Sequence, residues 1–134
     1  MLPPTCSITH RPDLDALIVR WPTDASYPQL QADFEAILAA AQQHATGHWL
    51  LDVRRRAHLA PQLGDWTTRI FFPHAATQLA PQPLRLSVLC SPARMAVYAA
   101  SAEQQSYLAH GTGHRAYHMH LVCDEGEAMR WLLG

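Results

Sequence analysis

The stretch "PLRLSVLCSPAR", residues 83–94, contains a strand pattern that leads directly into a helix start. From Leu84 to Cys90, apolar side chains alternate with arginine and serine, which is close to the two-residue period of a β-strand. A helix is predicted to begin directly afterwards, because Ser91 is a favourable N-cap and Pro92 suits the first helical position. A strand followed at once by a helix is the repeating unit of α/β proteins.

The same alternation of strand and helix continues on both sides of this unit. Upstream, "SITHRPDLDALIVRWP" (residues 7–22) predicts a hairpin, because proline and aspartate favour a turn between its two halves. Helical spacing of apolar residues predicts the next helix, with Ser26 as its N-cap and Gly47 as its stop. Pro73 predicts a kink or break in a later helix. The other predicted elements are a strand at 48–56, helices from about 61 and from 92, a strand at 116–124 and a final helix at 124–134.

The resulting order is ββαβαβαβα in one domain, residues 1–134, with a mixed, mainly parallel sheet and an N-terminal antiparallel hairpin. In each predicted strand one parity is apolar and the other carries polar residues. A parallel sheet with helices on both faces usually shows continuous apolar runs, so this alternation predicts helices mainly on one face. The nominally open face then carries Arg20, Asp52, Arg54, Arg85, Ser87, His118 and His120.

Three stretches, "WLLDVRRR" (49–56), "FFPHAATQLAPQPLRLSVLCSP" (71–92) and "DEGEAMRWLL" (124–133), together with the hairpin, resemble the STAS domain of bacterial anti-sigma-factor antagonists. The resemblance is closer to the small SpoIIAA-like (STAS-like and Sec14-like) bacterial proteins of unassigned function. It implies a STAS-like fold and a non-enzymatic regulatory or binding role, since none of the matching motifs is catalytic. In the antagonists a phosphorylatable hydroxyl begins the helix after the second parallel strand. The corresponding "RRAHLAPQLG" (55–64) has none, so no phosphoswitch is expected.

Composition narrows the classes of function. The chain has 134 residues, of which 49% are hydrophobic and 16% charged, as is typical of globular proteins. Ten basic residues, all arginine, against eleven acidic ones argue against a nucleic-acid partner. The three cysteines are widely spaced and odd in number, so a reducing cytoplasm is expected. No run approaches the roughly 20 apolar residues of a membrane span, and no apolar signal core is seen near the start.

Arginines 54–56 end a predicted strand at the edge of the sheet where α/β proteins bind ligands. Two interpretations stay open: these arginines grip a phosphate or carboxylate, or they form a solvated cap paired with Asp52 or Asp65. There is no Walker, G-x-S-x-G or H-E-x-x-H motif, and no cofactor is predicted. The residues predicted to bind a small apolar or anionic ligand, or a protein partner, are Arg20, Asp52, Arg54, Arg55, Arg85 and Ser87.

The histidine-rich stretch "HGTGHRAYHMH" (110–120) raises the question of a metal site. His118 and His120 share one parity of a predicted strand, so their rings project from one face within reach of a single ion. His110 and His114 belong to a predicted glycine-bearing loop, and nearby arginines would repel a cation. The stretch is therefore either a solvated or interface-lining face, or the metal site of a small metal- or ligand-dependent enzyme, which is the alternative function.

A homodimer is predicted from the apolar surface. The chain has many large apolar groups for a small domain, and part of that surface is expected to be covered by a second copy. The large groups are Trp21, Trp49, Phe71, Phe72 and Trp131, and an apolar strip on the nominally open face consists of Ile18, Leu50, Leu89 and Val122.

Overall fold

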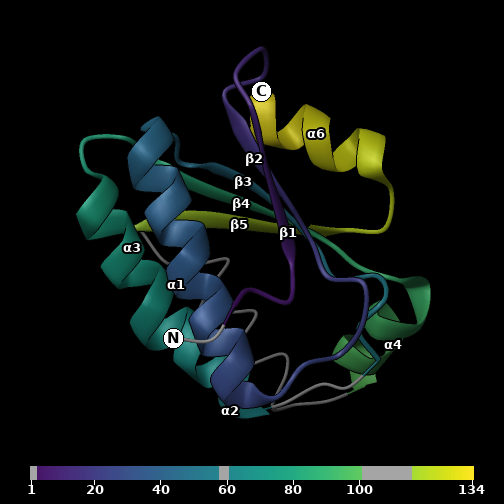
Figure 1. The fold of residues 1–134 in the computed structure, drawn as a ribbon. Helices are drawn as coiled ribbons and strands as arrows, with labels where there is room; N and C mark the ends of the chain where they lie inside the picture. The colour runs from purple at the N-terminus through teal and green to yellow at the C-terminus, as the bar shows by residue number, and fades with distance from the viewer. Residues whose placement is uncertain (1–2, 58–60, 101–115) are drawn as a thin grey trace.

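The computed structural model describes residues 3–57, 61–100 and 116–134. Within these residues, five strands form one sheet in the order β1-β2-β3-β4-β5 (Figure 1). β1 runs antiparallel to β2, and the other neighbouring strands are parallel, which confirms the predicted α/β fold with a mixed, mainly parallel sheet. The strands are β1 (Ser7–Arg11), β2 (Ala16–Arg20), β3 (His48–Asp52), β4 (Leu84–Leu89) and β5 (Tyr117–Val122).

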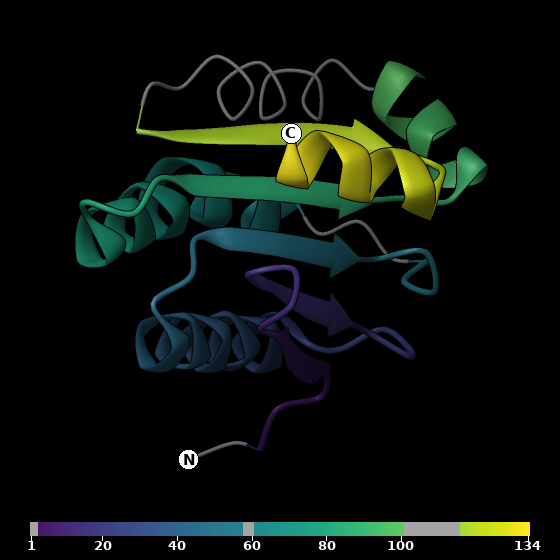
Figure 2. The ribbon, with the colours of Figure 1, turned by 90° about the horizontal axis from the view of Figure 1, so that it is seen from above.

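The helices gather mainly on one face of the sheet. Seen from above, α1 and α3 lie on one side of the strands and α6 lies on the other, over β4 and β5 (Figure 2). In the described part of the chain, no helix is long and apolar enough to cross a bilayer. The helical elements are α1 (Tyr27–His44), α2 (Pro61–Trp66), the π-helical turn η1 (Thr67–Phe71), α3 (Phe72–Leu79), α4 (Pro92–Ala100) and α6 (Glu125–Leu133).

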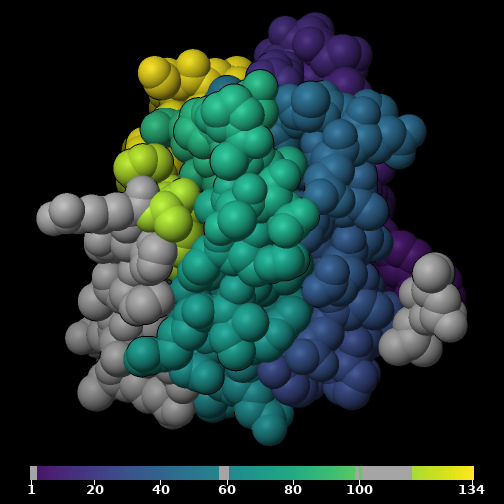
Figure 3. Space-filling view, turned by 90° about the vertical axis from the view of Figure 1, so that its left-hand side faces the viewer, coloured from purple at the N-terminus to yellow at the C-terminus, as the bar shows by residue number. Residues whose placement is uncertain are grey.

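The larger hydrophobic core lies between the sheet and the helical layer of α1, α2, η1 and α3. The sheet contributes the apolar parity of its strands, among them Leu17, Trp49 and Tyr117, which are fully buried. In the space-filling view, α1 and the α2–α3 segment lie side by side over this face (Figure 3). Phe34 of α1 contacts the neighbouring segment, with its ring centroid 5.3 Å from that of Phe71. The predicted inner face of the sheet is therefore confirmed.

The opposite face of the sheet is not open along its centre, because α6 covers it. Ala128 and Leu132 of α6 pack on a second, smaller cluster of buried apolar residues. The alternation from which an open face was predicted continues beneath α6, because polar Ser87 and Arg85 donate hydrogen bonds to backbone oxygens of that helix. The apolar strip of Ile18, Leu50, Leu89 and Val122 belongs to this cluster.

Burial within the chain removes the reason for which a homodimer was predicted. The apolar strip packs beneath α6, and Trp131 of the same helix is partly buried against it. The other large side chains lie inside the larger core, each less than 4% exposed: Trp21, Trp49, Phe71 and Phe72. The homodimer stays a prediction, without support from these groups.

Two details of the helices follow from local geometry. α1 ends at His44, before Gly47, and its C-cap Ala45 takes the left-handed conformation with φ 51°. The predicted stop at Gly47 is therefore wrong; a glycine is needed there because a Cβ would lie 2.1 Å from the carbonyl oxygen of Pro83. The predicted break at Pro73 takes the form of η1, a π-helical turn just before the proline. Proline lacks a backbone N–H and has a bulky ring, and both disturb regular α-helical hydrogen bonding.

Candidate functional site

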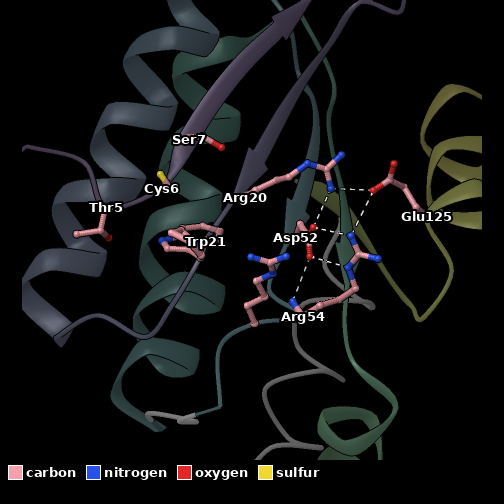
Figure 4. A pocket seen from close by; sticks show the side chains of 10 residues that line it. Thr5, Cys6, Ser7, Arg20, Trp21, Asp52, Arg54 and Glu125 are labelled. Carbon is pink, nitrogen blue, oxygen red and sulfur yellow. Dashed lines mark hydrogen bonds and ion pairs between the residues drawn. The ribbon is translucent and has the colours of Figure 1, made fainter.

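A pocket of about 700 Å³ lies at the carboxyl ends of β2 and β3 (Figure 4). The topology brings its walls together: Arg20 and Asp52 are paired residues at the ends of these parallel strands, and Ser7 at the start of β1 lies opposite Arg20. This edge of an open α/β sheet is where ligands usually bind, and small-molecule sites typically enclose about 300–1,000 Å³. The described residues that line the pocket are Thr5, Cys6, Ser7, Arg20, Trp21, Pro22, Asp52, Arg54, Arg55 and Glu125.

Two arginines and two carboxylates form an ion network along one wall of the pocket. Nη1 of Arg20 lies 2.7 Å from Oδ2 of Asp52 and 2.7 Å from Oε1 of Glu125. Arg54 donates to Asp52 through Nε at 3.0 Å and Nη2 at 2.9 Å, and its Nη2 lies 3.5 Å from Oε1 of Glu125. The network thus joins the ends of β2 and β3 to the first residue of α6, three segments that are far apart in the sequence.

The electrostatics of this network favour its charged form. Burial alone raises the pKa of the Asp52 carboxyl, but hydrogen bonds from Arg54 and Arg20 outweigh burial and hold that pKa below its usual value. The hydrogen bond to Glu125 is the main cause of the raised pKa of Arg20, and the hydrogen bond to Asp52 is the main cause for Arg54. Asp52 is therefore an ionised anchor for two cations at neutral pH rather than a proton donor.

The opposite wall is uncharged and is held in place by a buried carboxylate. Nε1 of Trp21 donates to Oδ2 of Asp33 at 2.9 Å, and the backbone N of Thr5 donates to Oδ1 of Asp33 at 2.8 Å. Asp33 belongs to α1 and is fully buried, so it positions these two lining residues from behind. Burial raises the pKa of Cys6 to about 12, so its thiol stays protonated at neutral pH and is an apolar surface rather than a nucleophile.

The three consecutive arginines after β3 occupy three different environments. Arg54 is paired with Asp52, as one of the two interpretations predicted, whereas Asp65 pairs with Arg69. Arg55 is exposed and lines the pocket, and among the described residues it makes no ion pair. Arg56 is 6% exposed, and burial, with a smaller effect of nearby Arg94, lowers its pKa to about 10.

Four of the six predicted binding residues converge on the pocket: Arg20, Asp52, Arg54 and Arg55. The other two lie further along the same face, beneath α6. Ser87 is fully buried and donates to the backbone oxygen of Ala128 at 3.0 Å. Arg85 donates to the backbone oxygen of Trp131 at 2.6 Å, and its guanidinium lies 4.2 Å from the centre of the Trp131 ring. These contacts give Ser87 and Arg85 a role in attaching α6 to the sheet.

The two histidines proposed as metal ligands are on β5, outside the pocket. His118 is exposed, and it is paired across the sheet with Arg85. The ring of His120 stacks on that of Trp131, with 5.1 Å between the centroids. In the part of the chain that the structure describes, no three histidine, cysteine, aspartate or glutamate side chains come close enough to hold a metal ion. His110 and His114 lie outside the described residues.

Sequence reasoning missed Glu125 and Asp33. The sequence at 124–127 is typical of an acidic helix start, and Asp124 is indeed the cap, since it accepts from the backbone N of Glu127 at 2.8 Å; Glu125 instead contacts Arg20. One sequence signal pointed to Asp33: it is a charged residue beside Leu30 and Phe34, on the apolar face of a helix. Such a residue is rarely buried without a partner, and here two of its partners, Trp21 and Thr5, line the pocket.

No family model, curated protein or solved structure matches this chain.

Proposed function

We propose that this protein is a non-enzymatic binding module of the STAS-like type, with a regulatory role in the cytoplasm, and that it binds a small anionic ligand with an apolar body. The ligand would occupy the pocket at the ends of β2 and β3. Its anionic group would contact the arginines, and its apolar body would lie against Pro22 and Cys6.

The proposal rests on one observation: Arg55 lines the pocket and makes no ion pair with any described residue. Among the described lining residues, three arginines face two carboxylates, which leaves one positive charge in excess. Arg20 and Arg54 are engaged with Asp52 and Glu125, whereas Arg55 makes no ion pair within the described residues. An arginine without a partner, at the ligand edge of an α/β sheet, is suited to hold a carboxylate or phosphate through two parallel hydrogen bonds.

The pocket favours binding over catalysis as a function. Asp52 is held ionised by two arginines, and the Cys6 thiol is held protonated by burial. Neither group is poised for proton transfer or nucleophilic attack near neutral pH. A docking role toward a second copy of the chain stays a separate prediction, which sedimentation at about tens of micromolar, a range suited to moderate interfaces, tests directly.

Titration with 2-naphthoate, followed by nuclear magnetic resonance, tests the proposed function. Drug-sized ligands gain ~0.3 kcal/mol of binding free energy per heavy atom, so this probe should bind with a Kd of about 1 mM or tighter. Arg55→Gln should weaken binding about three- to ten-fold, because a charged contact is lost without disturbing the network. Arg130→Gln is the matched control, since Arg130 is exposed on α6 and does not line the pocket.

Two comparisons complete this experiment. The neutral isostere 2-naphthamide should bind more weakly than 2-naphthoate, because the pocket carries an excess positive charge. The proposed function is wrong if 2-naphthoate causes no shifts at several times 1 mM, the affinity expected for a ligand of its size. It is equally wrong if Arg55→Gln and Arg130→Gln bind the probe alike.

A further inference from the structure

We infer that the Glu125 carboxylate occupies the position of the ligand's anionic group, so that a carboxylate ligand must displace Glu125 to bind Arg20 and Arg54. This inference rests on the proposed function and specifies its ligand class and its regulation. Glu125 would act as a built-in competitor, supplied by the helix that covers the other face of the sheet.

The two carboxylates of the network are held very differently. Asp52 accepts from the backbone N, Nε and Nη2 of Arg54 as well as from Arg20, and its side chain is only 9% exposed. Glu125 is 44% exposed and has one close contact, at 2.7 Å to Arg20, with the second arginine 3.5 Å away. Asp52 is therefore a fixed part of the site, and Glu125 is the carboxylate that a ligand in solution can replace.

Displacement of Glu125 does not require α6 to leave the sheet. The helix is capped by Asp124 and anchored further along by Ala128 and Leu132, which are 0% and 1% exposed. Ser87 also donates to the backbone of α6 at Ala128. The side chain of Glu125 can consequently swing into solvent by rotation about its own bonds, while the helix stays in place.

The position of Glu125 specifies what replaces it. Its Oε1 lies on Nη1 of Arg20 and faces Nη2 of Arg54, on the same wall of the pocket as these guanidinium groups (Figure 4). A ligand carboxylate placed there would contact both arginines, and Arg55 lines the same pocket. Removal of the Glu125 charge also raises the excess positive charge of the pocket, so an anion binds more tightly to a site without this carboxylate.

Glu125→Gln tests the inference with 2-naphthoate as the probe, measured by the same titration. The substitution keeps the size of the side chain but removes its charge, and we expect the probe to bind about three- to ten-fold more tightly than to wild type. Glu127→Gln is the matched control: it removes the same charge from the same helical turn, but Glu127 does not line the pocket. It should leave the affinity within two-fold of wild type, because only long-range, screened charge changes.

The outcomes separate this inference from the proposed function. Tighter binding to Glu125→Gln alone supports both. Binding to wild type that Glu125→Gln leaves unchanged, or that Glu127→Gln strengthens equally, overturns the competitor role of Glu125 and leaves the binding function intact. No binding to wild type or to either variant overturns both.

Discussion

Replacement of Asp52 by asparagine tests whether the ion network at the sheet edge stabilises the fold as its geometry indicates. The carboxylate accepts from the backbone N, Nε and Nη2 of Arg54 at 3.1, 3.0 and 2.9 Å, and from Nη1 of Arg20 at 2.7 Å. Asparagine keeps one acceptor oxygen and turns an amide donor toward the guanidinium groups. Hydrogen bonds to charged groups contribute about 1.5–3 kcal/mol each. Because both arginine side chains are more than 40% exposed and regain water, we expect a net loss of about 2 kcal/mol.

Urea unfolding at several pH values measures this loss and identifies its source. The folded-state pKa of Asp52 lies below its unfolded value, so its contribution is complete above the unfolded pKa of about 3.9 and is lost as the pH falls through the folded pKa. The difference between wild type and Asp52→Asn should therefore shrink at acid pH.

Asp65→Asn is the control for this measurement. Asp65 pairs with Arg69 across one helical turn, with both side chains about half exposed, so its loss should stay below about 0.5 kcal/mol. If Asp52→Asn costs no more than Asp65→Asn at pH 7, the reasoning that the network is strongly held is refuted.

Three further changes probe residues outside the network. Ser87→Ala should lower the free energy of unfolding by about 1 kcal/mol, because a buried hydrogen bond to α6 is lost; an unchanged urea midpoint would count against this contact. Arg56→Met should leave the free energy of unfolding unchanged or raise it by up to about 2 kcal/mol, because it removes a buried charge but keeps an unbranched side chain against Trp21. A decrease of more than about 2 kcal/mol would mean that the guanidinium stabilises the fold. After dialysis, the metal content of untagged wild type should equal that of the His118→Ala, His120→Ala double variant. About one equivalent of metal retained by wild type alone would indicate a complete ligand set and favour the metalloenzyme alternative.

The fold was predictable because its signals are local. The alternation of apolar and polar residues in "LRLSVLC" depends only on strand geometry, and the cap at Ser91 depends only on the next few residues; the backbone N of Arg94 does donate to Ser91 Oγ, at 3.1 Å. Parity also predicted that Arg20, Asp52 and Arg54 share one face of the sheet, and the structure brings them together at one edge of it. The prediction of a shared face needed no knowledge of side-chain packing, whereas the meeting at one edge follows from the register of β2 and β3, in which Arg20 pairs with Asp52.

The part of the site that the sequence did not predict depends on where α6 lies. The contact between Arg20 and Glu125 spans 105 residues of sequence, and it exists only because α6 crosses to the face opposite α1. The same crossing covers Ser87 and Arg85, which have the right parity for the polar face but not the exposure that parity alone suggests. Periodicity assigns a residue to a face, whereas the choice of face for a single helix follows from tertiary packing.

The most direct measurement is a crystal structure of the protein with 2-naphthoate. The carboxylate should lie within about 3 Å of the guanidinium nitrogens of Arg20 and Arg54, at ordinary charged hydrogen-bond distances, with the naphthalene ring against Pro22 and Cys6 and the Glu125 side chain turned into solvent. A probe carboxylate found away from these arginines, or a pocket left empty while the probe binds elsewhere, would contradict a ligand site at the ends of β2 and β3.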